Sequence, residues 1–284
     1  MNSLNVFIRN LQKQKTVGIL SIACLGISIA VALLIGLWAM NELSFDNFHK
    51  DRDKIYRLTI NSFKNNESVV FGSTFKPFAE EAKDKFPEIE SACRVTPWSL
   101  GEIWIGNVIH KESKVIVADS NFFTFFSFPL KVGNTVTILN SPDNMVIDEA
   151  AARKYFPGED PIGKSVRYGG VNFTIAGIMY DLPANSHLQG HFVVPFFGWY
   201  ARDVWGGSDI YLTYLKLGEN TDFQKLQTGL TDILTSNMES FRDRKSNVYL
   251  EPLKDIHFSR SDFNSPILKG SKPLVMVFML TALV

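Results

Sequence analysis

The stretch VGILSIACLGISIAVALLIGLWAM, residues 17–40, decides the architecture of this chain because it contains no charged residue. At about 1.5 Å of rise per residue, a helix over this stretch exceeds the roughly 30 Å of hydrocarbon in a bilayer. A buried core helix of this length would normally carry a polar stripe. The apolar region of a cleaved signal peptide is shorter, about 7–15 residues. The stretch therefore predicts a retained transmembrane helix.

Residues 1–16, MNSLNVFIRNLQKQKT, precede the span and show helical periodicity. Their apolar residues recur at i, i+3, i+4 and i+7, which favours an amphipathic helix at the membrane surface; they are Leu4, Phe7, Ile8 and Leu11. A solvated tail with accidental periodicity is the alternative. Basic residues lie on both sides of the span, so their count does not decide orientation. Lys15 lies nearest to the span, which favours a cytoplasmic N-terminus.

Residues 272–284 begin with Lys272-Pro273 and continue as LVMVFMLTALV. Pro fits the first turn of a helix, and the run is too short to span a bilayer. It predicts the start of a second transmembrane helix that is cut off, with a buried C-terminal strand as the alternative. Residues 41–271 would then form one extracytoplasmic domain between two spans.

Composition excludes some classes of function. The 29 basic and 29 acidic side chains balance, so no nucleic acid partner is expected. Cys24 lies in the apolar stretch and Cys93 lies in the predicted domain, so we expect no disulfide between them.

The predicted domain combines helices and strands without regular βαβ alternation, which indicates an α+β fold. Residues 169–170, Gly-Gly, lie between two strand-like runs and predict a two-residue hairpin turn. Thr221 or Asp222 would cap a long helix. The expected helices cover 47–54, 73–86, 149–156 and 222–241, and the expected strands cover 55–63, 115–118, 166–168, 171–179, 210–217 and 248–253.

One string resembles a nucleotide-binding motif. Gly158 to Ser165, GEDPIGKS, matches the spacing of a phosphate-binding loop. Such a loop follows a strand and opens a helix, whereas here a helix-like run precedes it and a strand-like run follows. We interpret the string as a turn, and we expect no cofactor-binding residues in this chain.

Two further groups contain residue types found at catalytic or metal sites. Asp181, Ser186 and His187 have the chemistry of a hydrolase, but no nucleophile elbow surrounds the serine. His187 and His191 have the spacing of a helical metal pair, but Gly190 and Pro183 favour a loop. We interpret residues 185–187 as a hydrogen-bonded turn. No catalytic or metal-binding residues are therefore predicted.

The remaining chemistry-bearing residues have structural interpretations. Isolated histidines most often have structural roles; here they are His49, His110 and His257. A dense run of aromatic residues indicates core or a subunit interface; it comprises Phe122, Phe123, Phe125, Phe126 and Phe128.

In layout the chain resembles the first half of a MacB/FtsX-like ABC transporter permease. The resemblance covers nearly the whole chain in order, and its combination of short segments is more specific than any one of them. The segments are Asn10-Leu11, Asn41 to His49, Ile55 to Arg57, Pro87 to Glu90, Ala118 to Phe123, Asp160 to Gly163, Gly177, Asp181 to His187 and Pro252 to Phe258.

The resemblance implies a permease subunit with a periplasmic core domain, a non-enzymatic chain in the bacterial inner membrane with residues 41–271 in the periplasm. ATP would bind a separate cytoplasmic ATPase subunit, so no cofactor is expected here. A second permease copy, membrane lipid and periplasmic or outer-membrane proteins would be the other partners. Residues 41–49 would couple movement of the span to the domain, for export or mechanotransmission. The alternatives are a single-pass membrane-anchored sensor or ligand-binding domain, and an extracytoplasmic enzyme.

Overall fold

The computed structural model describes residues 15–64, 67–96, 100–198, 204–206, 210–259, 267 and 269–282. The chain divides into two compact units. One contains residues 1–45 and 270–284, and the other contains residues 46–269. The predicted amphipathic helix at residues 1–16 falls almost entirely outside the described residues.

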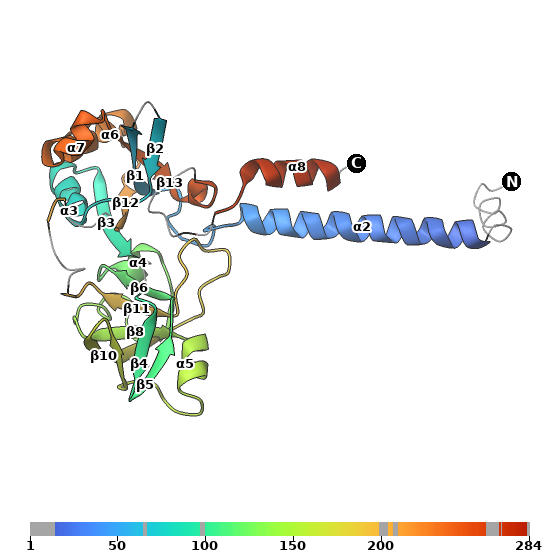
Figure 1. The fold of residues 1–284 in the computed structure, drawn as a ribbon, viewed down its shortest axis with the longest axis horizontal. Helices are drawn as coiled ribbons and strands as arrows, with labels where there is room; N and C mark the ends of the chain where they lie inside the picture. Colours follow the sequence, from blue (N-terminus) through green and yellow to red (C-terminus); the bar gives the residue numbers. More distant parts are fainter. Residues whose placement is uncertain are drawn as a thin grey trace. The chain divides into compact units, whose positions relative to one another are not determined.

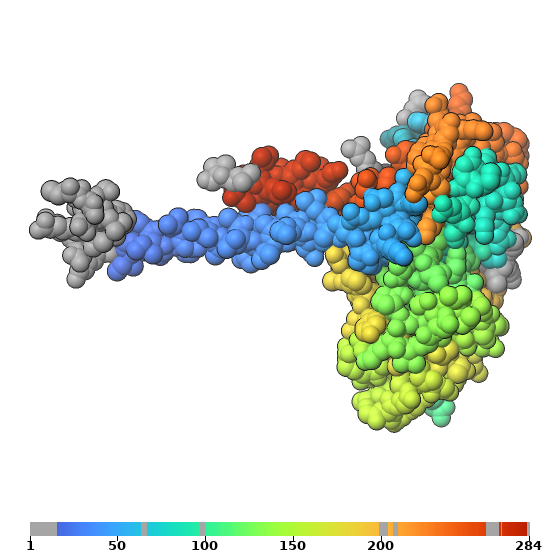
Figure 2. Space-filling view, turned by 180° about the vertical axis from the view of Figure 1, so that it is seen from behind, coloured from blue at the N-terminus to red at the C-terminus, as the bar shows by residue number. Residues whose placement is uncertain are grey.

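In the part of the first unit that the structure describes lie two apolar helices, α2 (Lys15–Leu43) and α8 (Lys272–Ala282). By length and composition, residues 16–43 could cross a membrane, and most large apolar side chains of α2 are exposed along its length (Figure 2). The helices lie side by side (Figure 1), with the Trp38 and Phe278 rings in edge contact at 5.4 Å between centroids. The alternative of a C-terminal strand is therefore wrong, while a second span stays a prediction.

The second unit is built on one continuous mixed sheet. Its main path runs β13-β1-β12-β3-β6-β11-β8-β10-β9-β4-β5, with β2 paired to β1 and β7 paired to β10. The β10–β8 and β11–β6 pairs are parallel and the others are antiparallel. The strands are β1 (Ile55–Lys64), β2 (Glu67–Phe71), β3 (Ile89–Thr96), β4 (Glu102–Ile105), β5 (Val108–Lys111), β6 (Val115–Ala118), β7 (Leu130–Val132), β8 (Asn144–Asp148), β9 (Ser165–Tyr168), β10 (Val171–Met179), β11 (Phe192–Pro195), β12 (Leu212–Leu217) and β13 (Asn247–Pro252).

Among the described residues of this unit, five helices and the 3-10 turn η2 accompany the sheet, and the α+β prediction is confirmed. They are α3 (Lys76–Lys85), α4 (Phe122–Phe125), α5 (Glu149–Tyr155), α6 (Phe223–Asn237), α7 (Glu239–Asp243) and η2 (Leu253–Phe258). Helices α3, α6 and α7 cover one face of β1, β12 and β13 (Figure 1). Their contact buries Leu58, Leu215 and Leu230 completely.

The opposite face of this part of the sheet carries the aromatic run, residues 122–128. Phe122 and Phe126 are fully buried, and the run packs with Leu212 and Tyr214 of β12. Of the two interpretations of this run, the structure therefore supports core. A third cluster lies beneath α5 and is formed largely by strands β4, β6 and β8–β11.

Local patterns placed several elements correctly. The β9–β10 hairpin turns at Gly169 and Gly170, whose φ angles of 57° and 83° are those of a type I′ turn. Such angles favour glycine because it lacks a Cβ. Strand β6 occupies the predicted residues 115–118. Helix α3 begins at Lys76 rather than at residue 73, because Thr74 pairs with Tyr211 in an isolated bridge.

Two helix predictions were wrong in extent or kind. Residues 47–54 form successive turns and no helix, because their backbone hydrogen bonds join residues three apart: the Arg52 amide donates to the His49 carbonyl and the Lys54 amide to the Asp51 carbonyl. Asp46, with a left-handed φ of 58°, separates these turns from α2. The helix predicted over 222–241 is split at Met238, whose backbone is extended, into α6 and α7. Its cap is Asp222, whose carboxylate accepts a hydrogen bond from the Lys225 amide at 3.0 Å.

Removal of this cap makes a direct test of the α6 assignment. We expect Asp222→Ala to lower the free energy of unfolding by about 1 kcal/mol, because the first helical turn loses a side-chain acceptor. Urea unfolding of the detergent-solubilised chain, followed by circular dichroism, measures it. Thr221→Ala is the matched control, since Thr221 Oγ1 donates to the Gly218 carbonyl instead. An equal or larger loss in the control would contradict the assignment.

Candidate functional site: the Asp46 network

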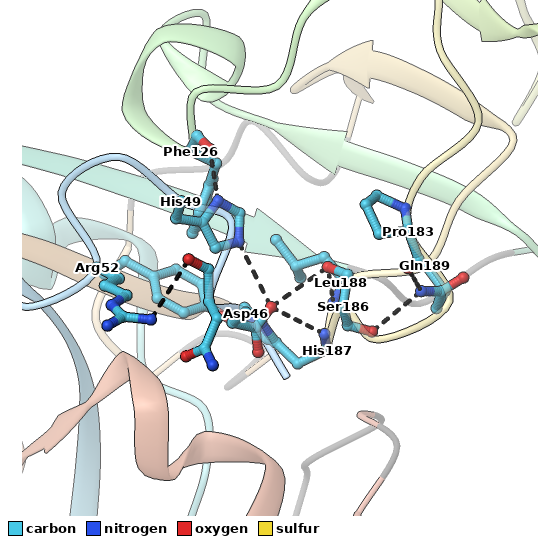
Figure 3. A network of polar contacts seen from close by, with 11 residues as sticks. Asp46, His49, Arg52, Phe126, Pro183, Ser186, His187, Leu188 and Gln189 are labelled. Atoms are coloured by element: carbon cyan, nitrogen blue, oxygen red, sulfur yellow. Dashed lines mark hydrogen bonds and ion pairs between the residues drawn. The ribbon is translucent and has the colours of Figure 1, made fainter. Parts of the chain in front are cut away.

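The candidate site begins where the chain enters the second unit. Residues 44–54 form a series of turns, and at Asp46 the amide donates to the Asn185 carbonyl at 2.9 Å. The left-handed φ of Asp46 is tolerated better by Asp than by most residues. This geometry directs the Asp46 carboxylate toward the loop between β10 and β11, residues 180–191 (Figure 3).

The carboxylate of Asp46 is buried among three polar side chains (Figure 3). Oδ1 lies 2.8 Å from His187 Nδ1 and 3.4 Å from His49 Nε2. It also accepts a hydrogen bond from the His187 amide at 3.1 Å and one from Ser186 Oγ at 3.4 Å. Asp46, His49, Ser186 and His187 are each at most 2% exposed. A buried carboxylate in such a position needs these partners to offset its lost hydration.

Both histidines continue the network into the sheet and α4. His187 Nε2 lies 2.8 Å from the Tyr214 hydroxyl on β12, and His49 Nδ1 donates to the Phe126 carbonyl at 2.5 Å. The carbonyl only accepts, so Nδ1 of His49 carries a proton. Burial raises the pKa of Tyr214 well above its usual range, so the phenol stays protonated. One network therefore joins turn 44–54, loop 180–191, β12 and α4.

The loop that supplies His187 is itself held by short-range hydrogen bonds. The Ser186 amide donates to the Pro183 carbonyl at 3.0 Å, and Gln189 Nε2 donates to the Pro183 and Ser186 carbonyls at 2.9 and 3.0 Å. The turn predicted at residues 185–187 is therefore confirmed. Its longer-range partner, Asp46, was not foreseen.

Asp46 has a strongly displaced acidity. Burial acts to raise the pKa of its carboxyl, but the nearby charge and hydrogen bonds of His187, together with His49, outweigh burial and hold the pKa well below its usual range. A carboxyl with a lower pKa in the folded state stabilises the fold when ionised. That stabilisation is full above the unfolded value of about 3.9 and is lost as pH falls through the folded pKa.

A pH series on Asp46→Asn follows from this direction. We expect the variant to be less stable than the parent by about 1–3 kcal/mol at pH 7, because a charge-assisted acceptor is lost. The difference should shrink below about pH 4, where the parent begins to lose the same contribution. Urea unfolding of both chains at several pH values measures it. A difference that stays constant down to pH 3, or grows there, would contradict the depressed pKa.

The hydrolase-like residues are not assembled for catalysis. Ser186 Oγ points to Asp46 and accepts from the Leu188 amide at 3.2 Å. Asp181 lies elsewhere, accepting from the Ala150 amide at 2.8 Å and pairing with Arg153 at 3.0 Å. Ser186 and His187 are too deeply buried to meet a substrate. This arrangement is suited to holding two segments together.

The histidines spaced as a metal pair have separate partners. His191 Nδ1 lies 2.6 Å from Asp148 Oδ2 at the start of α5, whereas His187 faces Asp46 and Tyr214. Among the described residues, no group of three or more His, Cys, Asp or Glu side chains could hold a metal ion. His110 packs edge-on against Tyr155 at 5.0 Å, and His257 is buried in η2.

The string at Gly158–Ser165 forms most of the connection between α5 and β9 and ends on the first residue of β9. The Gly163 amide donates to the Ile175 carbonyl at 2.8 Å, and Lys164 pairs with Glu159. A helix therefore precedes the string and a strand follows it, as the sequence predicted. Cys24 and Cys93 are both free, and burial raises the pKa of the Cys93 thiol.

A second buried ionic pair was missed in the sequence. Arg57 on β1 is fully buried and donates from Nε and Nη2 to Glu251 Oε2 at 3.0 and 2.6 Å. Nη2 also donates to Ser259 Oγ at 3.1 Å. The available signal was an arginine at an alternating position of a strand that is otherwise largely apolar. Arg57 and Glu251 are cross-strand neighbours on β1 and β13.

Comparison with known proteins places this architecture. The sequence model for the MacB-like periplasmic core domain matches residues 19–233, three quarters of the chain. The chain belongs to this family. The predicted resemblance to MacB/FtsX-like permeases is thereby confirmed, and the second unit is a MacB-like domain. The family is a transporter permease domain and not a known class of enzyme.

Individual relatives are distant. The macrolide export ATP-binding/permease protein MacB of Mannheimia succiniciproducens is 24% identical over 140 residues, which are 48% of this chain and 22% of that protein. The chain thus spans about a fifth of its curated relative. A domain described as belonging to a permease of Porphyromonas gingivalis matches 81% of this chain and 98% of its own, at 23% identity and a TM-score of 0.63. The extracellular domain of the noncanonic ABC-type transporter YknZ from Gram-positive bacteria covers 69% and 98%, at 12% identity and 0.50. These structures show a shared fold.

The family match and the apolar helix α2 together support a membrane-anchored chain whose MacB-like domain lies outside the cytoplasm. The match begins inside α2 and continues through most of the sheet, so both units contribute to it. Residues 41–49, singled out in the sequence, contain the boundary between the two units at Phe45 and Asp46.

Proposed function

We propose that this chain acts in a MacB/FtsX-like ABC transporter as a permease subunit that couples a cytoplasmic ATPase to an extracytoplasmic domain. The observation that carries the proposal is the family match over residues 19–233, because this single match covers both the apolar helix α2 and most of the sheet. The second apolar helix, α8, supports it because it packs beside α2 through Trp38 and Phe278. The output is export or mechanotransmission across the envelope.

The proposed partners follow from this role. A separate ATPase subunit binds ATP, a second permease copy completes the unit, and α2 contacts membrane lipid. Residues 41–271 form a domain in the periplasm, where it contacts periplasmic or outer-membrane proteins. Helix α2 lies in the inner membrane. This chain performs no catalysis. Residues 1–16 lie on the cytoplasmic side, where they contact the ATPase.

The Asp46 network supplies the coupling in this proposal. Asp46 and His49 follow α2 closely in sequence. Asp46 binds His187 of loop 180–191, which in turn contacts Tyr214 of β12, and His49 binds the carbonyl of Phe126 at the end of α4. Displacement of turn 44–54 would therefore act on β12, an interior strand of the sheet. Because close-packed protein interiors have low compressibility, a displacement of the turn would be transmitted to the strand that it contacts.

Co-purification tests the ATPase partnership. The full gene product, tagged and extracted from its own membranes in mild detergent, is expected to bring down an ATP-binding subunit. Deletion of residues 1–16 should abolish that association while α2 keeps the protein in the membrane. An intact association after the deletion would contradict the contact, and recovery of no ATP-binding subunit with the undeleted protein would contradict the partnership.

Cysteine labelling tests the orientation. Cys93 is buried and Cys24 lies within α2, so a new surface cysteine reports with little background. Lys83→Cys on the exposed side of α3 should react with a membrane-impermeant maleimide in spheroplasts. Asn10→Cys, before α2, should react only after lysis. The reverse pattern would place the domain in the cytoplasm and end the proposal.

A further inference from the structure

A groove of about 340 Å³ lies between helix α6 and strand β13, which run side by side in the part of the sheet covered by α6 (Figure 1). Its size is within the range of small-ligand sites in proteins, about 300–1,000 Å³. None of the residues of the Asp46 network lines it. The groove is therefore separate from the candidate site described above.

Amide side chains dominate these walls. Asn61, Gln224 and Asn247 line the groove, and their side chains make no hydrogen bond with any residue that the structure describes. An amide offers both a donor and an acceptor, which matches a hydroxyl group, itself donor and acceptor. The groove therefore presents several unused groups of the kind that recognise hydroxyls.

An aromatic side chain lies beside these amides. Tyr249 lines the groove and is 50% exposed. Its neighbours in β13, Val248 and Leu250, point to the other side of the strand and are buried. A half-exposed ring offers an apolar face with a polar tip, which suits a ligand that has alternating C–H and hydroxyl surfaces.

The charge of the groove excludes an anionic ligand. Among the described residues that line it there is no Lys or Arg, and Asp232 supplies one negative charge. A phosphate or an acidic polymer would meet no positive partner and one repulsive carboxylate. The recognised chemistry is therefore neutral.

The strand edge beside the groove is already occupied. Strand β13 ends the sheet, and its Val248 and Leu250 amides donate to Thr231 Oγ1 and Gln227 Oε1 of α6, each at 2.9 Å. An extended peptide that added to this edge would need those amides. The side chains of α6 thus occupy the hydrogen-bond donors that an added peptide strand would need. Gln227 Nε2 makes no hydrogen bond to another described residue.

We propose that the groove binds a neutral saccharide chain. A sugar ring stacks on Tyr249, and its hydroxyls exchange hydrogen bonds with Asn61, Gln224 and Asn247. Asp232 accepts from a further hydroxyl. The inference stands on the groove alone and does not depend on the transport role.

Isothermal titration of the full chain in nanodiscs tests the proposal. The probes are three neutral tetrasaccharides, tetra-N-acetylchitotetraose, maltotetraose and cellotetraose, with tetragalacturonate as the acidic comparison. At least one neutral probe is expected to bind, and Tyr249→Ala and Gln224→Ala should each weaken it about fivefold to tenfold. Gln224 is exposed on α6, so its replacement leaves the strand intact.

Tyr180→Ala is the matched control, because Tyr180 is similarly exposed at 48% but does not line the groove. It should bind as the parent does. Four results would overturn the proposal: no binding of any neutral probe at millimolar concentration, tighter binding of tetragalacturonate, equal binding by the parent and both groove variants, or displacement of the sugar by a random nonapeptide library that binds more tightly. None of them would bear on the ATPase partnership.

Discussion

Replacement of His187 by Ala is expected to lower the free energy of unfolding by about 3–5 kcal/mol at pH 7. The Asp46 carboxylate, 1% exposed, would lose the group 2.8 Å from its Oδ1, and the Tyr214 hydroxyl would lose its partner at 2.8 Å. The carboxylate would keep only its longer contacts, with the residue-187 amide at 3.1 Å and with Ser186 and His49 at 3.4 Å, so less of its desolvation cost would be offset. Urea unfolding of the detergent-solubilised chain measures the loss.

His191→Ala is the matched control for His187. His191 lies in the same loop and also faces a carboxylate, Asp148, but its side chain is 30% exposed. Solvent replaces its contribution in part, so the loss should be clearly smaller. A double variant, Asp46→Asn with His187→Ala, should lose less than the sum of its single changes because the two side chains interact. Equal losses at His187 and His191, or strict additivity, would contradict the network.

Replacement of Glu251 by Leu is expected to cost a comparable 3–5 kcal/mol or so, because the fully buried Arg57 guanidinium would keep its charge without the carboxylate. Removal of both charges, in Arg57→Met with Glu251→Leu, should recover much of that loss, since apolar side chains of similar volume can replace a buried pair. Thermal unfolding of the three variants measures the pattern.

The exposed pair Arg242–Glu239 provides the comparison for Arg57. Its nitrogen and oxygen lie 2.8 Å apart, yet both side chains are more than half exposed. Arg242→Met should change stability little because water screens such a pair. If Glu251→Leu were as mild as Arg242→Met, or if the double replacement at Arg57 and Glu251 were the most damaging change, the buried pair would not have the role assigned to it.

Local patterns account for the parts of the fold that the sequence predicted. An uncharged run defines α2, the pair Gly169-Gly170 defines the hairpin turn, and Asp222 caps α6. Strands β8 and β11 were missed because nearly all their residues are buried, so neither shows the alternation that marks a half-buried strand. The helix predicted at residues 47–54 was wrong because charge and spacing do not distinguish successive turns from a helix.

Only part of the candidate site was predicted from the sequence, for a different reason. The turn at residues 185–187 follows from short-range chemistry, but Asp46 and His187 are 141 positions apart, and Arg57 and Glu251 are 194 apart. No periodicity links such residues. Only the pairing of β1 with β12 and β13, and the path of loop 180–191, brings them together.

The central claim, that turn 44–54 carries movement from the membrane helix to the sheet, is tested most directly by hydrogen–deuterium exchange. The permease assembled with its ATPase in nanodiscs is compared with and without a non-hydrolysable ATP analogue. The account predicts that amide exchange in residues 44–54 and 180–191 differs between the two states, and that Asp46→Asn removes the difference in 180–191. Identical exchange of both segments in the two nucleotide states would contradict it.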